Sequence, residues 1–466
     1  MAGRQSSNPI SQGQTIPLMV AMGWGLGSLG MSTLFQAFSV LLLRYLTDYL
    51  GIAAVVAGFM IGGSKIFDAL IDPAIGALSD RTRSRWGRRR PYLLIGGAAC
   101  VVSFVLMFNV PPLQNKTLRI VLVEVVLLAF AAGYGLFNIP YLAMPPEMST
   151  SPRARTTLIS FRVAGVGVGS LLASFVGPLL ITFGGGGVAG HKLMAWGVAA
   201  VVLASSLGCF FLTGRARFTA RGEAKRHSFA RHFKLAMQNK PFKTLVCVKL
   251  ISLLGQGMTF AVTPYLFIEV LKSNYAVMGQ YFLVYFVALL ATLPLWVKLC
   301  HRFGKKAAYL AVTPFVMLIT LSWLWAGPGE PLAWIMIRAA LLGGFGGSTL
   351  LIIQGMLPDT IHYDFIRTGL RREGVFAGVY TTIEKLASAA AAGLVGVILG
   401  AFGYVASAGL KVHQPASAIQ AVYLLSAIPA ATLGISALLL LFYHLPENML
   451  AEAGDTEEGG DLPITA

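Results

Sequence analysis

Twelve long apolar stretches follow one another along this chain of 466 residues, and they limit what it can fold into. A helix needs roughly 20 apolar residues to cross the hydrocarbon core of a bilayer. The chain is 56% hydrophobic and only 12% charged, whereas a soluble domain carries about 25% charged residues. A soluble core of this size could not cover so much apolar surface. The sequence therefore predicts an all-α polytopic membrane protein with twelve transmembrane helices.

The predicted spans form two sets of six. In the first half of the chain they run near 17–47, 53–79, 92–111, 118–146, 157–184 and 190–213. In the second half they run near 242–271, 276–300, 306–326, 332–357, 375–404 and 416–445. Gly and Pro are frequent inside them, as membrane helices tolerate.

The loops between the spans alternate in charge. One set is basic, and the other, such as PPLQNK and AGPGEP, is short and nearly free of Lys and Arg. The positive-inside rule places the basic loops in the cytoplasm, together with both chain termini. The formal net charge of +17 is therefore a topology signal for an inner (plasma) membrane protein. It does not indicate a nucleic-acid partner, because no basic patch with exposed aromatics is visible.

The longest and most basic loop, 214–243, divides the chain into an N-terminal half, 1–213, and a C-terminal half, 244–445. A faint internal repeat supports this division: SDRTRSRWGRRR follows the second span, and VKLCHRFGKKAA follows the eighth. Two similar halves joined by a central loop are the plan of the major facilitator fold. The tail, 446–466, is acidic and Gly-rich, and we expect it to be disordered.

Two carboxylates, Asp68 and Asp72, lie inside the second span. Helical spacing of i and i+4 puts both on one face, about one turn apart. A charge in hydrocarbon is costly, so an intramembrane acid is first of all a candidate functional site. Like charges in low dielectric repel, which makes the pair either a proton carrier or an alkali-cation site, such as one for Na+. The alternative is an ion pair that only locks helices together.

The balancing charge is expected from Lys385, in the eleventh span GVYTTIEKLASAAAAGLVG. Glu384 adjoins it, and neighbouring side chains on a helix do not share a face. We expect Lys385 to face the aspartates, because two carboxylates need a cation when the coupling ion is absent. For Glu384 a structural pair is favoured over a direct role.

Several polar side chains inside apolar spans are candidates for binding a substrate. Arg162 has no acid nearby in the sequence, and a buried guanidinium needs an acid or an anionic or hydroxyl-rich substrate. Tyr134 and Asn138 share one face of the fourth span, where they could bond a polar substrate or a neighbouring helix. Single glutamines in apolar spans are weaker candidates: Gln36, Gln256 and Gln354.

A gate network is expected near the cytoplasmic ends of the helices. Asp359 and Asp364, at the end of the tenth span, suit such a network better than substrate binding, and Arg88 of the basic loop is assigned to it as well. No metal-ligand spacing, phosphate loop or nucleophile motif appears. We therefore expect neither an enzyme nor a cofactor, and the only ion expected is the coupling H+ or Na+.

At these residues the sequence resembles the glycoside–pentoside–hexuronide:cation symporters, the melibiose permease family within the major facilitator superfamily. The resemblance covers essentially the whole chain and rests on FDALIDPAIG followed by RTRSRWGRRRPY, then NIPY, RARTTLISFR and TTIEK. It implies symport driven by sodium or protons. It also implies that Asp68 and Asp72 are the cation-site acids with Lys385 beside them. Thr381 and Arg162 match positions near that site or the cavity.

This sequence departs from the melibiose-type pattern at the sugar site. Ser32 and Asn138 stand where that pattern has sugar-binding acids, and Leu142 and Leu350 stand where it has stacking aromatics. Gly135 replaces a hydroxyl ligand of the cation site. The cation machinery is mostly kept and the galactoside site is not. Loss of the hydroxyl favours a proton as coupling ion, because sodium prefers several oxygen ligands.

These observations lead to one main hypothesis and two alternatives. The main hypothesis is a secondary active symporter that couples inward movement of H+ or Na+ to uptake of a small solute, a glycoside or related sugar, by alternating access. An amphiphilic or anionic cargo such as a lysolipid would use the same fold. A non-transporting receptor or scaffold is the third reading. We expect the protein to work as a monomer in the lipid bilayer.

Overall fold

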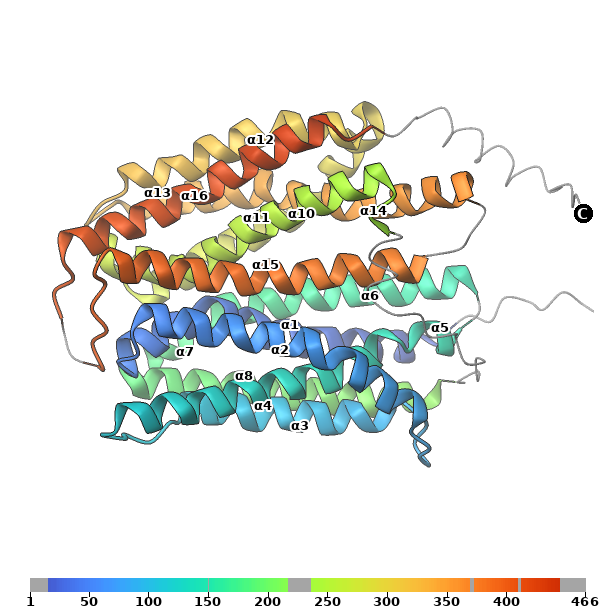
Figure 1. Ribbon diagram of the computed structural model, residues 1–466, viewed down its shortest axis with the longest axis horizontal. Coiled ribbons are helices and arrows are strands. Elements are labelled where there is room, and N and C mark those ends of the chain that lie inside the picture. The colour runs from blue at the N-terminus through green and yellow to red at the C-terminus, as the bar shows by residue number, and fades with distance from the viewer. Residues whose placement is uncertain (1–15, 150, 217–235, 369–372, 410–411, 445–466) are drawn as a thin grey trace, which may run out of the picture. The chain divides into compact units, whose positions relative to one another are not determined.

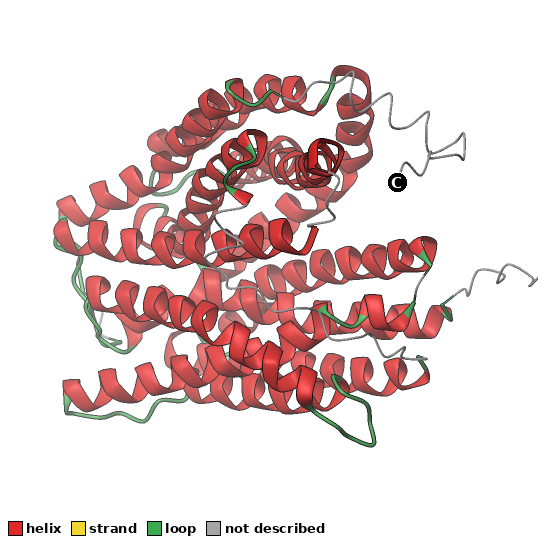
Figure 2. Ribbon diagram, turned by 45° about the vertical axis from the view of Figure 1, so that its right-hand side comes forward, coloured by secondary structure: helices red, strands yellow, loops and turns green. Residues whose placement is uncertain are grey.

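The computed structural model describes residues 16–149, 151–216, 236–368, 373–409 and 412–444 of the chain. All regular elements within these residues are helices (Figures 1 and 2). Twelve of the helical segments found there are long and apolar enough to cross a membrane. Their bounds agree with the predicted spans to within a few residues, the tenth span excepted. The predicted all-α polytopic class is confirmed.

The described part of the first half of the chain contributes eight α-helices and three short π- or 3₁₀-helical turns. They are α1 (Leu18–Arg44), η1 (Tyr45–Tyr49), α2 (Ala54–Arg81), α3 (Arg90–Phe108), α4 (Lys116–Leu142), α5 (Pro145–Met148), α6 (Pro152–Leu171), η2 (Leu172–Val176), α7 (Gly177–Phe183), α8 (Gly187–Leu212) and η3 (Thr213–Arg215). Each long helix matches an apolar run of the sequence, because only a helix satisfies its own backbone in hydrocarbon.

The second half repeats this pattern of long apolar helices. They are α10 (Lys240–Tyr265), η4 (Leu266–Val270), α11 (Tyr275–Phe303), α12 (Lys305–Leu321), η5 (Ser322–Trp325), α13 (Leu332–Leu341), η6 (Leu342–Gly346), α14 (Gly347–Thr368), α15 (Glu373–Ala401) and α16 (Ala416–Leu441). Helix α10 packs along both α15 and α16.

The tenth span is longer than the sequence predicts. The apolar run ends near 357, but α14 continues to Thr368 and carries Asp359 and Asp364 on the added turns. The count of apolar residues measures the part of a helix that suits hydrocarbon, whereas a helix can continue into water with a polar face. The prediction marked the end of the apolar run and missed the end of the helix.

Four of the long helices contain or end in a π-helical turn: η1, η2, η4 and η6. The clearest is η6, with the sequence LGGFG between α13 and α14. There the Gly344 carbonyl accepts from Trp296 Nε1 at 2.6 Å and from Thr292 Oγ1 at 3.0 Å. Such turns are frequent at functional sites, because they release backbone groups from the regular helical ladder.

The internal repeat seen in the sequence has a structural counterpart. Gly87 and Gly304 both have positive φ, 91° and 83°, which a residue without a Cβ adopts at little cost. The basic residue after each glycine pairs with an acid of a later helix: Arg88 with Glu147 of α5, and Lys305 with Asp359 of α14 at 2.7 Å. The same turn and ion pair therefore occur once in each half of the sequence.

The contacts of the chain group it into two compact units. Unit 1 contains residues 1–38, 70–180 and 191–224, and unit 2 contains residues 39–69, 181–190 and 225–466. The end of α1 and the first half of α2 thus pack with the helices of the second half. The predicted division into halves at 214–243 stays a prediction, since residues 217–235 lie outside the described part. The predicted tail, 446–466, lies outside it too.

Small residues explain how α2 packs within unit 2. A Cβ added to Gly58 would lie 2.8 Å from the Ala392 carbonyl oxygen, and one added to Gly62 would lie 3.0 Å from that of Ala389. The backbones of α2 and α15 are therefore so close that a side chain larger than that of glycine would not fit between them. Small residues commonly permit such close packing of membrane helices. This close approach brings the first half of α2 against the middle of α15.

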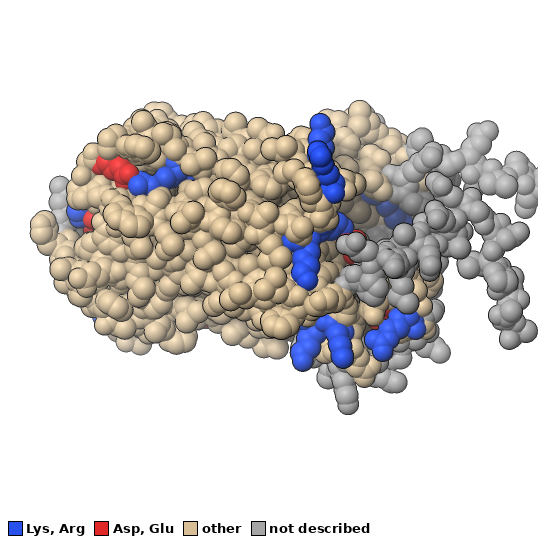
Figure 3. Space-filling view, turned by 90° about the horizontal axis from the view of Figure 1, so that it is seen from above, with Lys and Arg blue, Asp and Glu red and all other residues tan. Residues whose placement is uncertain are grey.

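Large apolar side chains are exposed on many of the long helices, among them Leu70, Phe183, Leu318 and Leu438. Figure 3 shows a wide surface with almost no charged side chains, with most of the visible Lys and Arg gathered to one side of it. An apolar patch of this extent would be unstable in water and is what a helix bundle presents to lipid.

Candidate functional site

The two aspartates of the second span lie on one continuous helix, α2, as predicted. Asp68 is buried and Asp72 is half-buried. Pro73 lies in the same helix and has no N–H to donate to the carbonyl of Ala69, four residues earlier. One turn of α2 therefore offers two carboxylates and a carbonyl that lacks its intrahelical donor, and oxygen ligands of this kind suit an alkali cation or a proton.

Lys385 of α15 meets Asp68. Its Nζ lies 2.8 Å from Asp68 Oδ2, and the two side chains are 18% and 4% exposed. Asp68 Oδ1 is buried and makes no hydrogen bond within the described residues. The carboxylate is thus half satisfied by the lysine and keeps one oxygen for another ligand. Thr381, one turn before Lys385, is exposed and donates to the Gly378 carbonyl at 3.0 Å.

A second ion pair starts from the neighbouring residue on α15. Lys249 Nζ of α10 lies 2.5 Å from Glu384 Oε1, and it also donates to the Tyr380 carbonyl at 3.3 Å. Gln354 Nε2 donates to the same Glu384 oxygen at 3.3 Å. The Lys249 side chain is 1% exposed. Glu384 forms the kind of pair that the sequence favoured, but its partner was not foreseen.

Two buried lysines escaped the sequence analysis. Lys65 is 7% exposed and lies one turn before Asp68 on α2, and Lys249 is the lysine just described. Both stand inside apolar runs, so the cost of a charge in hydrocarbon was an available signal.

The substrate candidates of unit 1 lie on three helices. Arg162 of α6 is half-buried, and its guanidinium has no hydrogen-bond or ion-pair partner among the described residues. Asn138 of α4 is half-buried, and Tyr134, one turn earlier, has its ring 6.3 Å from that of Phe35. Gln36 is 5% exposed, with its Nε2 lacking a hydrogen-bond partner in the described chain. The Arg162 guanidinium and the Gln36 amide nitrogen therefore keep donors for a ligand.

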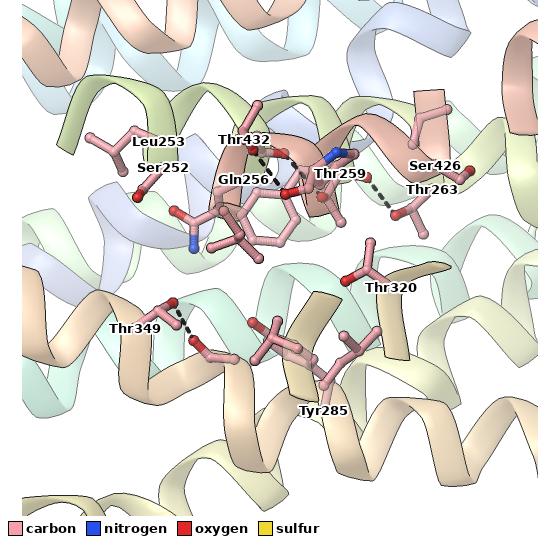
Figure 4. A pocket seen from close by; sticks show the side chains of 18 of the residues that line it. Ser252, Leu253, Gln256, Thr259, Thr263, Tyr285, Thr320, Thr349, Ser426 and Thr432 are labelled. Carbon is pink, nitrogen blue, oxygen red and sulfur yellow. Dashed lines mark hydrogen bonds between the residues drawn. The ribbon is translucent and has the colours of Figure 1, made fainter. Parts of the chain in front are cut away.

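Gln256 and Gln354 both line a cavity in unit 2 (Figure 4). The cavity has a volume of about 120 Å³ and is surrounded by α10, α11, α12, α14 and α16. Lys249 lies at its wall as well, so the Lys249–Glu384 pair adjoins this space.

The residues assigned to a gate each form a pair inside their own unit. Arg88 pairs with Glu147, and Arg89 Nε also bonds Glu147, at 2.7 Å. Asp359 accepts from Lys305, and Asp364 is buried and accepts from Asn239 Nδ2 at 3.4 Å. A gate role for these residues stays a prediction.

A dense charged cluster at the end of α1 was also missed. Arg44 lies 2.8 Å from Asp48 Oδ2 and 2.6 Å from Glu269 Oε1. The Tyr404 hydroxyl donates to Asp48 Oδ1 at 2.8 Å. Burial raises the pKa of Tyr404, so its hydroxyl keeps the proton that this bond needs. The i, i+4 spacing of Arg44 and Asp48 in an apolar span was the available signal.

Twelve apolar helices with glycine-mediated close packing, buried ion pairs and a polar cavity define a membrane transport protein that binds its cargo between helices. The chain belongs to the family described as MFS/sugar transport protein, whose profile matches residues 23–447. The resemblance to the glycoside–pentoside–hexuronide:cation symporters of the major facilitator superfamily is confirmed.

Individual relatives and a solved structure agree with this family. The chain is 28% identical to the putative glycoside/cation symporter YagG of Escherichia coli, over 84% of each chain. It is 27% identical to the isoprimeverose transporter of Lactiplantibacillus pentosus, over 94% of this chain and 91% of the relative. A solved bacterial homologue of the lysosomal transporter Spinster has a TM-score of 0.65 at 14% identity, over 91% of this chain and 96% of that one. That last likeness shows the fold alone.

Proposed function

We propose that this protein is a secondary active symporter that couples inward movement of H+ or Na+ to the uptake of a glycoside or related sugar. The family and the names of the two relatives, a putative glycoside/cation symporter and an isoprimeverose transporter, support this proposal. They favour a sugar over the lysolipid alternative, and they argue for a transporter rather than an enzyme or a receptor.

The contact between Asp68 and Lys385 carries the mechanism. Without the coupling ion, the lysine ammonium balances the buried carboxylate at 2.8 Å. A proton or Na+ that binds Asp68 neutralises the carboxylate in place of the lysine. Asp72 and the Ala69 carbonyl lie within one helical turn and can contribute further oxygens. Lys385 is then released from its carboxylate. Because α15 is held to α2 partly by this pair, ion binding changes the free energy that keeps the two helices together.

The identity of the ion follows from the number of oxygen ligands. Sodium prefers several oxygens, and Gly135 stands where the family pattern has a hydroxyl. The described residues contain no cluster of three or more acidic, His or Cys side chains that would hold a metal. We therefore favour a proton at Asp68 and keep Na+ as the second candidate.

The protein is an integral membrane protein, and we further propose that it lies in the inner (plasma) membrane with both termini in the cytoplasm and acts as a monomer. The alternation of basic and nearly uncharged loops supports this orientation.

Proteoliposome uptake tests the proposed function directly. Purified protein would be reconstituted, and a proton or sodium gradient imposed while uptake of labelled glycosides, pentoses and lysolipids is followed. We expect concentrative uptake of a glycoside or sugar that collapses when the driving gradient is dissipated. Uptake of lysolipids alone, or uptake that no cation gradient drives, would contradict the proposal.

A further inference from the structure

Polar side chains lie on opposite sides of the cavity of unit 2 (Figure 4). Gln256 and Thr259 of α10 lie on one side of it, and Tyr285 and Thr349 lie on the other. Polar side chains from five helices reach this space, although the helices are otherwise apolar. Polar groups that converge on one cavity between apolar helices are typical of a ligand-binding site.

Most of these hydroxyl groups can only accept a further hydrogen bond. Each has a single proton, and here that proton is donated to a backbone carbonyl of its own helix, which leaves lone pairs for the cavity. The five donations are Thr259 to Gly255 at 3.0 Å, Thr263 to Thr259 at 2.6 Å, Thr349 to Gly346 at 2.7 Å, Ser426 to Val422 at 2.8 Å and Thr432 to Pro429 at 2.9 Å.

Four further groups at the cavity can donate as well as accept: the Gln256 amide and the hydroxyl groups of Thr320, Tyr281 and Tyr285. Acceptors therefore outnumber donors around the space. The best-matched ligand donates several hydrogen bonds and accepts a few, as the hydroxyl groups of a polyol do. A carboxylate or sulfonate, which only accepts, would meet mainly other acceptors.

The charge at the cavity agrees with a neutral ligand. Lys249 is the one cationic side chain in its described lining, and Glu384 holds that ammonium at 2.5 Å. An anionic ligand would have to displace this carboxylate. Phe282 of α11 and Phe260 of α10 also line the cavity, and their rings are 6.3 Å apart. Ring faces carry partial negative charge, so they attract the C–H groups on the apolar face of a sugar ring.

We infer that this cavity binds one ring of a neutral, polyhydroxylated solute, such as a single hexose or pentose unit. The inference rests on the proposed sugar transport and adds where the cargo sits and which chemical class it belongs to. Its volume of about 120 Å³ limits the occupant to one small ring, because an engineered cavity of about 150 Å³ in another protein holds benzene. Further rings of a glycoside would extend outside.

Three cavity variants and one control test the inference. Gln256→Leu removes a donor, Thr259→Val removes an acceptor with little change in shape, and Thr259→Ser keeps that acceptor. Thr313→Val is the matched control, because Thr313 is buried in α12, donates to the Tyr309 carbonyl in the same way and is outside the cavity lining. Gradient-driven uptake would be measured in proteoliposomes with glucose, galactose, xylose, their methyl glycosides and glucuronate.

We expect wild type to take up at least one neutral sugar and to prefer it to glucuronate. Gln256→Leu and Thr259→Val should each raise KM about tenfold, since a buried polar partner left unpaired costs about 1–3 kcal/mol. Thr259→Ser and Thr313→Val should stay within about twofold. If wild type transports a neutral sugar and both cavity variants keep its KM, the assigned cavity is wrong while sugar transport stands. Preference for glucuronate also overturns the inference. Uptake of no sugar in the panel overturns the proposed function together with it.

Discussion

Replacing Asp68 by Asn removes the carboxylate that Lys385 contacts at 2.8 Å. Losing one partner of a buried ion pair typically destabilises a protein by about 3–5 kcal/mol. Lys385 is 18% exposed and keeps its other contacts. We therefore expect a smaller loss in the free energy of unfolding, about 2–3 kcal/mol. The double variant Asp68→Asn/Lys385→Gln removes both charges, and it should recover to within about 1 kcal/mol of wild type.

Thermal unfolding in detergent, followed by intrinsic fluorescence, measures this difference. Unfolding entropy is about 2.1 cal/mol/K per residue, so a chain of this size has roughly 1 kcal/mol/K, and the single variant should lose about 2–3 °C in Tm. Asp80→Asn is the matched control. Asp80 also pairs with a cation, Arg89 at 3.0 Å, but its side chain is 53% exposed. An exposed pair contributes about 0–1 kcal/mol, so the control should shift by less than about 1 °C.

Accumulation of cargo in proteoliposomes is the second measurement on the same variants. A potential of 100 mV supplies about 2.3 kcal/mol per coupled charge, which corresponds to about 50-fold accumulation of a neutral solute. Wild type should approach this ratio, and both Asp68 variants should only equilibrate their cargo. The reasoning is refuted if the double variant is as unstable as the single one, because the two charges would then not be coupled. Concentrative uptake by Asp68→Asn would refute the assigned ion site.

Three shorter predictions concern packing and charge elsewhere in unit 2. Gly58→Val should abolish the folded protein on size-exclusion chromatography, because a Cβ there meets a carbonyl of α15 at 2.8 Å, whereas Gly63→Ala, with nothing within 4 Å, should be tolerated. Lys249→Met should lower Tm by less than Asp68→Asn does, since the partner carboxylate is 40% exposed and can be hydrated. Tyr404→Phe should lower Tm by removing the donor to Asp48. The raised pKa of Tyr404 makes that contribution constant up to about pH 10 and smaller above it, so the Tm difference from wild type should narrow only there.

The membrane spans and one side-chain contact could be predicted from the sequence. Span positions follow from the apolar length that hydrocarbon requires, a constraint that acts on each helix separately. The contact between Asp68 and Lys385 followed from charge balance, because buried carboxylates in one span need a cation from another. Both predictions rest on large free energies, the cost of polar backbone and of an unbalanced charge in hydrocarbon, which outweigh local sequence preferences.

The rest depends on how distant helices face one another. Lys249 and Glu384 are 135 residues apart, and no local pattern shows that their faces meet. The hydroxyl-lined cavity is a further case, since Ser and Thr in membrane helices are common and usually satisfied by their own backbone. Only the packed structure shows that Thr259 and Thr349, from different helices, border the same space.

Helix α15 contacts both Asp68 of the proposed ion site and Lys249 at the wall of this cavity, which would give the proposed symport a physical basis. Lys385 reaches Asp68 on α2, and the adjacent Glu384 reaches Lys249 on α10, which is possible because neighbouring side chains point about 100° apart around a helix. In the proposed mechanism, ion binding at Asp68 would release the first of these two ion pairs of α15. Any resulting shift of α15 moves Glu384, and Lys249 is a wall residue of the cavity. Cargo that fits the cavity better after the shift must, by reciprocity, bind the ion-loaded state more tightly. A transporter in which the two residues lay on separate helices would need a longer chain of contacts for the same coupling.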